Sequence, residues 1–312
     1  CKRCTKVSCK LFGPALRALG NAKMIRVMCE NRLLQRPAMI NSGLMRSFVL
    51  LASAIVVLSA AAAPATASSS DWHDSEGGKV RLVTTGKPDA QGKLQGALEI
   101  ALKPGWKTYW RDPGDSGVPP QIGVERSSNV AKAVLAYPAP QRHDDGYSKW
   151  AGYDYPVTLP VTFTVPSPGE PVKIEADVLL GICETICIPV QAKFTIDPAT
   201  GSDDQADATV VKAALSALPA GAQADFGINV LPGDQETLVV EAKVPGDGTA
   251  SDFFVAGEQG YMFGTPVKAM KSGKIVFTVP ILDRPSEVPT GEGLFYTLTD
   301  GASSVSGMLR YP

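Results

Sequence analysis

Hydrophobic and polar residues alternate along most of the chain after about residue 72. In LQGALEIALK (94–103), Leu94, Leu98 and Ile100 fall on one face of an extended strand, with Gln95 and Glu99 opposite. Further short runs of this kind, each bounded by Gly, Pro or Asp, lie at 156–165, 237–244, 274–281 and 294–299. Because 25 prolines and 30 glycines also suit many turns, we predict an all-β sandwich architecture.

One segment departs from this alternation and has a helical period instead. Within 203–221, acidic residues come first, Pro219 and Gly221 come last, and the apolar positions i, i+3, i+4 and i+7 are Val211, Ala214, Leu215 and Leu218. We therefore predict a first β-domain over 72–200, a helical connector over 201–221 packed between the two halves, and a second, smaller β-domain over 222–312.

The first 67 residues have a different composition. Met45 and Arg46 precede an apolar run at 48–63, and Ala65-Thr66-Ala67 is a small-x-small triplet. This arrangement predicts a secretory signal peptide over 45–67, cleaved after Ala67. An uncleaved anchor is the alternative, although the run is shorter than the about 20 residues of a membrane span. We interpret 1–44 as a mis-called upstream segment, whose four cysteines lack a nearby histidine for a zinc site.

If residues 1–67 are absent from the exported protein, the balance of acidic and basic residues changes. Residues 68–312 hold 20 basic and 30 acidic residues, with no basic run and no interleaved aromatic stripe. Nucleic acid is therefore not an expected partner. This part of the chain also holds two cysteines, Cys183 and Cys187, which would lie in an oxidising compartment.

These two cysteines lie at the end of a predicted hairpin. Apolar residues occupy the even positions from 172 to 182 and again from 188 to 196. If the runs pair antiparallel with Cys183 opposite Cys187, every apolar residue falls on one face, and a slip of one residue would break this pattern. Directly opposed cysteines can form a disulfide. In this register both thiols lie off the core-facing side, where a partner can approach, and the tip is Glu184-Thr185-Ile186.

Three interpretations of the pair remain open on spacing alone. A structural bridge is the general expectation for an exported domain, but closing a loop of about five residues constrains the unfolded chain little. Two thiolates can also hold Cu(I), although they supply only half of a zinc site. A small ring near the surface is typical of a labile disulfide, which favours thiol–disulfide exchange.

Three blocks of sequence around the pair resemble a known family. They are GWKTYWRDPGDSGVPP (105–120), YPAPQRHDDGYSKWAGYDYPVTLPV (137–161) and VLLGICETICIPVQAKF (178–194). They are similar to the amino-terminal periplasmic domain of the thiol:disulfide interchange protein DsbD, and the C-x3-C spacing favours the ScsB (suppressor of copper sensitivity) branch. The resemblance implies a periplasmic location and an immunoglobulin-like β-sandwich, followed by the helical connector and the second, smaller β-sandwich.

The resemblance also implies a function for the cysteines. Cys183 and Cys187 would be the catalytic residues of a thiol:disulfide oxidoreductase of the protein-disulfide reductase type, with no cofactor and no metal. They would carry electrons from a membrane-embedded donor of the DsbD/CcdA type to oxidised periplasmic thioredoxin-fold proteins. The sequence shows neither a multi-helix membrane domain nor a C-x-x-C thioredoxin domain, so a separate donor is implied.

Aromatic residues near the pair have two interpretations. Trp106, Tyr109, Trp110 and Tyr153 are candidates for a cap that shields the thiols from oxidants. Alternatively, they form a buried cluster that closes the end of the sandwich, and Tyr147 and Trp150 carry the same ambiguity. His143 is expected to be a solvated loop residue.

Overall fold

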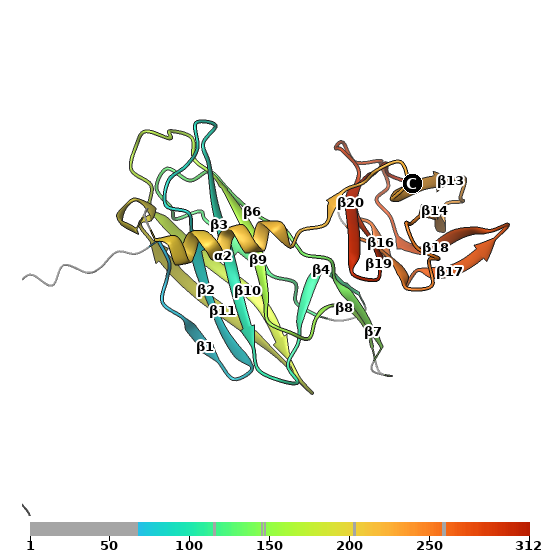
Figure 1. Cartoon of the computed structure of the whole chain (residues 1–312), viewed down its shortest axis with the longest axis horizontal. Coiled ribbons are helices and arrows are strands. Elements are labelled where there is room, and N and C mark those ends of the chain that lie inside the picture. The colour runs from blue at the N-terminus through green and yellow to red at the C-terminus, as the bar shows by residue number, and fades with distance from the viewer. Residues whose placement is uncertain (1–67, 115–116, 145, 147, 202–203, 258–259) are drawn as a thin grey trace, which may run out of the picture. The chain divides into compact units, whose positions relative to one another are not determined.

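The computed structural model describes residues 68–312, apart from 115–116, 145, 147, 202–203 and 258–259. The predicted upstream segment (1–44) and signal peptide (45–67) lie outside these residues and stay predictions. Strands make up most of the described chain (Figure 1), as the alternating pattern predicts. No helix in the described ranges is long and apolar enough to cross a membrane.

Strands β1 to β11 form three sheets, which together we call the first sandwich. Their strand orders are β1-β2-β3-β9-β6, β11-β10-β5 and β4-β8-β7. The bounds are β1 His73–Ser75, β2 Gly78–Thr84, β3 Lys93–Leu102, β4 Thr108–Gly114, β5 Gln121–Gly123, β6 Lys132–Leu135, β7 Gln141–Asp144, β8 Lys149–Tyr153, β9 Val157–Thr164, β10 Ile174–Cys183 and β11 Cys187–Ile196.

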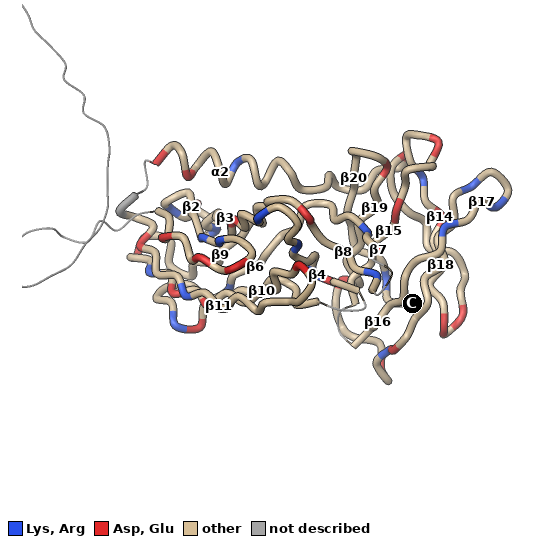
Figure 2. Tube along the Cα trace, turned by 90° about the horizontal axis from the view of Figure 1, so that it is seen from below, with Lys and Arg blue, Asp and Glu red and all other residues tan. Residues whose placement is uncertain are grey.

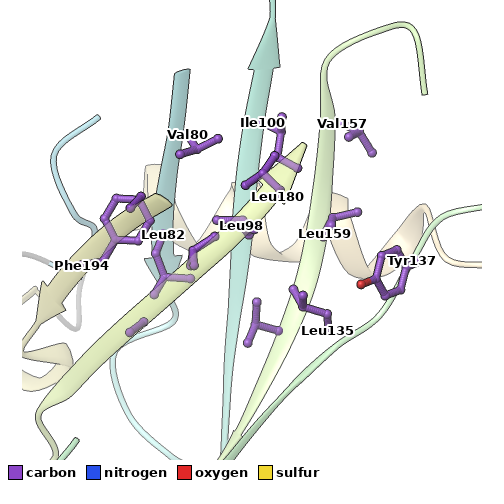
Figure 3. Close-up of a cluster of buried hydrophobic side chains, with 14 of the residues drawn as sticks. Val80, Leu82, Leu98, Ile100, Leu135, Tyr137, Val157, Leu159, Leu180 and Phe194 are labelled. Atoms are coloured by element: carbon purple, nitrogen blue, oxygen red, sulfur yellow. The ribbon is translucent and has the colours of Figure 1, made fainter. Parts of the chain in front are cut away.

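The core of the first sandwich lies between the five-stranded sheet and the sheet of β10 and β11. Leu82 and Leu98 from β2 and β3 meet Leu180 and Phe194 from β10 and β11 in one buried cluster (Figure 3). Each of these side chains is at most 4% exposed. Burial of one such side chain contributes about 1.5–3 kcal/mol, so this face of each strand decides how the sheets pack.

The β10–β11 hairpin has the predicted register. Its pairs include Ala176 with Phe194, Val178 with Ala192, Leu180 with Val190, Ile182 with Ile188, and Cys183 with Cys187. The even-numbered residues of both strands therefore share the core face, because a strand's side chains alternate between its two faces. Residues 184–186 make the turn, as expected.

A 3₁₀ turn at Pro198–Gly201 leads to the helix α2, Gln205–Ser216. Asp204 is its N-cap, and the Asp204 side chain accepts hydrogen bonds from the backbone of Ala206 and Asp207. The helix ends two residues before Leu218, whose backbone is restricted because Pro219 follows.

The helix α2 packs on the first sandwich rather than between the two halves. Val211 and Ala214 contact Val83 and Ala97, which lie on the face of β2 and β3 that points away from the main core. Figure 1 shows α2 crossing this sheet. The helix therefore links the two sandwiches in sequence, but the expectation that it packs between the two halves is wrong. So is the placement of Leu215 on the buried face, since Leu215 is 38% exposed.

The remaining strands form a second sandwich of two sheets. Their strand orders are β12-β20-β19-β15 and β13-β14-β18-β16, with β17 also paired to β18. The bounds are β12 Ala220–Gly221, β13 Gly227–Leu231, β14 Thr237–Lys243, β15 Ser251–Val255, β16 Met262–Phe263, β17 Val267–Lys271, β18 Lys274–Asp283, β19 Leu294–Asp300 and β20 Ser303–Leu309.

Side chains from both of these sheets build a core of their own. Val240, Phe253, Phe277 and Leu298 are each at most 1% exposed within it. The all-β class with a second, smaller sandwich is thus confirmed, whereas the domain limits at 200 and 222 stay a prediction. Acidic and basic residues are interspersed along both sandwiches (Figure 2).

The packing of α2 gives a first testable prediction. Val211→Ala should lower the free energy of unfolding by about 1–2 kcal/mol, because two buried methyl groups are lost and the better helix propensity of alanine offsets only part of this. Leu215→Ala should change it by no more than about 0.5 kcal/mol, as is usual for exposed positions. Urea denaturation of both variants measures the difference. Equal losses of stability in the two variants would contradict this packing, because Leu215 would then be as buried as Val211.

Candidate functional site

Cys183 and Cys187 form a disulfide at the end of the β10–β11 hairpin. Their Cα atoms are 4.1 Å apart, since the two residues are directly opposed in the register. The turn between them is exposed, and the Ile186 side chain at its tip is 70% exposed. The bridge therefore lies at the end of the sheet and close to solvent.

The two cysteines differ in their accessibility. Cys187 is exposed, whereas Cys183 is only 1% exposed. Both lie off the main core, as the register predicts, but Cys183 is covered by a separate small cluster with Tyr109 and Trp150. The expectation that a partner can approach both thiols is therefore wrong for Cys183.

The backbone before β4 is joined to the end of β10. Lys107 N donates to Cys183 O at 2.8 Å, and Cys183 N donates to Lys107 O at 2.9 Å. The hydroxyl of Thr108 donates to Gly181 O at 2.8 Å. These three bonds fix the position of the next residue, Tyr109, against the cysteines.

The hydroxyl of Tyr109 lies over the disulfide. Its oxygen is 3.0 Å from Cys183 Sγ and 3.2 Å from Cys187 Sγ. Because disulfide sulfurs carry no proton, the tyrosine is the donor. Its ring is 2% exposed and lies close to two glycines. A Cβ atom on Gly117, which has a φ of +141°, would lie 2.7 Å from the ring, and one on Gly181 would lie 3.3 Å from it.

Trp150 of β8 completes the cover over Cys183. Its ring meets that of Tyr109 edge to face, with centroids 6.0 Å apart. His143 of β7 stacks on Trp150 with centroids 3.9 Å apart, and Lys107 Nζ lies 4.5 Å from the centroid of the same ring. We call Tyr109 and Trp150 the aromatic cover.

His143 is thus a half-buried strand residue, and the expectation of a solvated loop residue is wrong. Burial lowers the pKa of His143 below its ordinary value, Lys107 lowers it further, and Asp154 opposes both effects. The imidazole is therefore neutral at pH 7 and stacks on Trp150 as an uncharged ring. Its Nε2 atom is buried and has no hydrogen-bond partner among the described residues.

The other predicted cap residues occupy different places. Trp106 and Trp110 belong to the main core of the first sandwich, and Trp110 contacts Phe254 of the second sandwich. Tyr153 is buried, and its hydroxyl donates to Pro138 O at 2.9 Å. Burial raises the pKa of Tyr153 well above its ordinary value. Tyr109 is therefore the candidate that the structure brings to the sulfurs, and Tyr147 lies outside the described residues.

Sequence reasoning did not single out the residues that hold the cover in place. Lys107 acts through its backbone, and Gly117 and Gly181 act through the absence of a side chain. The one available signal in the sequence is the Gly-rich composition of GDSGVPP (114–120), which does not by itself point to the cysteines. Within the described part of the chain, no group of three or more His, Cys, Asp or Glu side chains is placed to hold a metal ion.

Comparisons with known proteins bear on this site. Residues 80–198 match the family described as "Thiol:disulfide interchange protein DsbD, N-terminal", and this segment contains both cysteines and the aromatic cover. The chain matches no curated protein sequence.

Two solved structures are similar to this chain. The N-terminal periplasmic domain of ScsB from Proteus mirabilis superposes with a TM-score of 0.63 at 22% identity, covering 77% of this chain and 97% of that one. This coverage exceeds the family match, so the shared fold includes strands of the second sandwich. The reduced n-terminal domain of DsbD from Neisseria meningitidis has a TM-score of 0.24 at 16% identity, covering 38% of this chain and 83% of that one.

The predicted resemblance is therefore confirmed for the segment that forms the site. Over residues 80–198, the chain matches the family model of DsbD amino-terminal domains.

Proposed function

We propose that this protein is a periplasmic thiol–disulfide exchange protein. It passes electrons from a membrane-embedded donor of the DsbD/CcdA type to oxidised periplasmic thioredoxin-fold proteins through Cys183 and Cys187. The observation that carries the proposal is an asymmetric disulfide, in which Cys187 is exposed, Cys183 is buried, and a hydroxyl donor lies beside both sulfurs. The family match over 80–198 and the periplasmic ScsB domain of the same fold support it.

Exposure assigns a role to each cysteine. A partner sulfur needs a clear line of approach to the sulfur that it attacks, and Cys187 is the exposed one. Cys187 therefore forms the mixed disulfide with each partner. Cys183, which is 1% exposed, resolves that mixed disulfide from within the protein.

The reaction with an oxidised partner proceeds in two exchanges. The Cys187 thiolate attacks one sulfur of the partner's disulfide, forming a mixed disulfide and releasing a partner thiolate. Cys183, deprotonated in turn, attacks Cys187 Sγ and releases the second partner thiolate. The partner thiolates take up the two protons that the cysteines lost, so two electrons and two protons reach the partner. The Cys183–Cys187 disulfide remains, and the donor's dithiol reduces it by the same steps in reverse.

The hydroxyl of Tyr109 favours these steps electrostatically. When a donor thiolate attacks Cys187, the bond between the two cysteines breaks and negative charge develops on Cys183 Sγ. The hydroxyl already lies 3.0 Å from that atom. A hydrogen bond to a charged acceptor is stronger than one to a neutral acceptor, so this contact strengthens as the sulfur leaves.

A structural bridge explains the geometry less well. The bridge closes a loop of five residues, and the stabilisation that a disulfide gives grows with the length of the closed loop. The extensive pairing of β10 with β11 already holds the two cysteines opposite each other. A disulfide at this place therefore adds little stability to the hairpin. The exposed position of Cys187, in contrast, suits thiol–disulfide exchange.

Single cysteine variants test the proposal. Reduced Cys183→Ser protein keeps the exposed Cys187 and should accumulate mixed disulfides with periplasmic proteins, because no resolving thiol remains. These adducts would appear on non-reducing gels and vanish with reductant. Cys187→Ser, the matched control, should trap few because its remaining thiol is covered.

Two other outcomes of that experiment would contradict the proposal. If neither variant forms adducts while the reduced wild type binds one Cu(I) ion through both thiols, the pair handles copper. If neither forms adducts and no copper binds, the bridge is structural.

The role of Tyr109 gives a separate prediction. Tyr109→Phe keeps the ring but removes the donor, and it should slow reduction of the disulfide by dithiothreitol about tenfold. A hydrogen bond to a charged group contributes about 1.5–3 kcal/mol, and about 1.4 kcal/mol corresponds to tenfold in rate. Tyr153→Phe is the control, since it removes the hydroxyl of another buried tyrosine that bonds to Pro138 O. An unchanged rate in Tyr109→Phe would exclude this role.

A further inference from the structure

The three-stranded sheet β4-β8-β7 has different neighbours on its two faces. Tyr109 and Trp110 are consecutive in β4, so their side chains point to opposite sides. Tyr109 reaches the disulfide. Trp110 instead meets Phe254 and Phe295 of the second sandwich, with ring centroids 5.9 and 6.4 Å away.

The two consecutive β7 residues Arg142 and His143 likewise point to opposite faces of the sheet. His143 stacks on Trp150 of the aromatic cover. Its neighbour Arg142 extends to the second sandwich, where Arg142 Nε donates to Asp252 Oδ2 at 3.0 Å and Nη2 donates to Phe253 O at 2.9 Å. The Arg142 guanidinium also lies 4.5 Å from the centroid of the Phe254 ring.

Further contacts join β4 to the same part of the second sandwich. The Asp112 carboxylate accepts a hydrogen bond from Gly257 N at 2.6 Å. The Arg111 guanidinium lies 3.9 Å from the centroid of the Phe295 ring. Phe254 and Ala256 are themselves members of the main core of the first sandwich. The second sandwich thus supports the sheet from the side opposite the disulfide.

We infer that the second sandwich positions the aromatic cover over Cys183, and that Arg142 is the positioning residue that joins the two. Within the described part of the chain, Arg142 contacts Asp252, Phe253 and Phe254 and not the sulfurs, so it acts through β7 on His143 and Trp150. This inference deepens the proposed function, because the cover decides which cysteine a partner reaches. The second sandwich then has a role in the sulfur chemistry although it contains no cysteine.

The physical reason is the small size of the sheet that carries the cover. β7 has four residues, and β4 pairs with β8 in an irregular register between Tyr109 and Gly114. Few ladder hydrogen bonds therefore hold these strands, and segments with few such bonds open locally at low cost in free energy. The contacts of Arg142 and Trp110 raise that cost. Without them, the cover should leave Cys183 more often.

Alkylation of the reduced full-length chain tests this directly. In the wild type, iodoacetamide should modify Cys187 much faster than Cys183, as read at each site by mass spectrometry. Arg142→Gln should accelerate modification of Cys183 about threefold to tenfold, which is the range of a partly exposed ion pair with one added hydrogen bond. Modification of Cys187 should change by less than about twofold, since Cys187 is already exposed.

Arg81→Gln is a matched control. Arg81 also pairs with a carboxylate, Glu99, and lies over an aromatic ring, that of Trp72 at 4.8 Å. The exposed fractions of the two arginine side chains are 23% for Arg81 and 24% for Arg142. Arg81 lies on β2, so its loss should leave the rate at Cys183 unchanged.

Three results would overturn the inference: an unchanged rate at Cys183 in Arg142→Gln, an equal acceleration in Arg81→Gln, or a Cys183 that is already fully reactive in the wild type. If Arg142→Gln does not fold, Asp252→Asn removes the same ion pair with little change in size, and the same expectations apply to it. The test needs only reduced thiols. A lack of partner adducts in Cys183→Ser would refute the proposed function while leaving this measurement decisive.

Discussion

Ten residue pairs join β10 to β11, and the last of them is Cys183 opposite Cys187. The even-numbered apolar residues of both strands share one face, so a slip of one residue would move all of them to the other face. Each buried side chain contributes about 1.5–3 kcal/mol, and several together exceed the whole stability of about 5–15 kcal/mol of a typical domain. The hairpin therefore holds the two sulfurs opposite each other whether or not they are bonded. The disulfide can open and close without rearrangement of the sheet.

The residues around the disulfide give its two cysteines unequal exposure to solvent. Cys187 faces solvent at the tip of the hairpin, while Cys183 lies under Tyr109 and Trp150. The aromatic rings exclude water from one sulfur, and the tyrosine hydroxyl supplies a donor where charge develops during exchange. Burial alone would make a thiolate at Cys183 unfavourable, because an uncompensated charge in an apolar site is costly. The single hydroxyl reduces this cost, and the residues around the ring hold it in place.

Much of this arrangement could be predicted from the sequence where a regular period applies. The even positions around the cysteines predict the hairpin, its register and its turn because both strands are regular. The apolar period of the helix is a weaker guide, because Leu215 shares the period of Val211 and is nevertheless exposed. Among Trp106, Tyr109 and Trp110, the ring that reaches the sulfurs is set by the backbone bonds between Lys107 and Cys183, which the period of a single strand does not predict. The covered state of Cys183 depends on β4 and β8, which are distant from the hairpin in sequence.

We propose that the bridge is a reactive centre in a fold that does not need it. The most direct measurement follows the redox state of Cys183–Cys187 and the β-sheet circular dichroism signal together during a titration with dithiothreitol. We expect modest dithiothreitol to reduce the bridge fully while the β-sheet signal stays unchanged, because the strand pairing is independent of the sulfur bond. A bridge that resists reduction until the protein unfolds would contradict it.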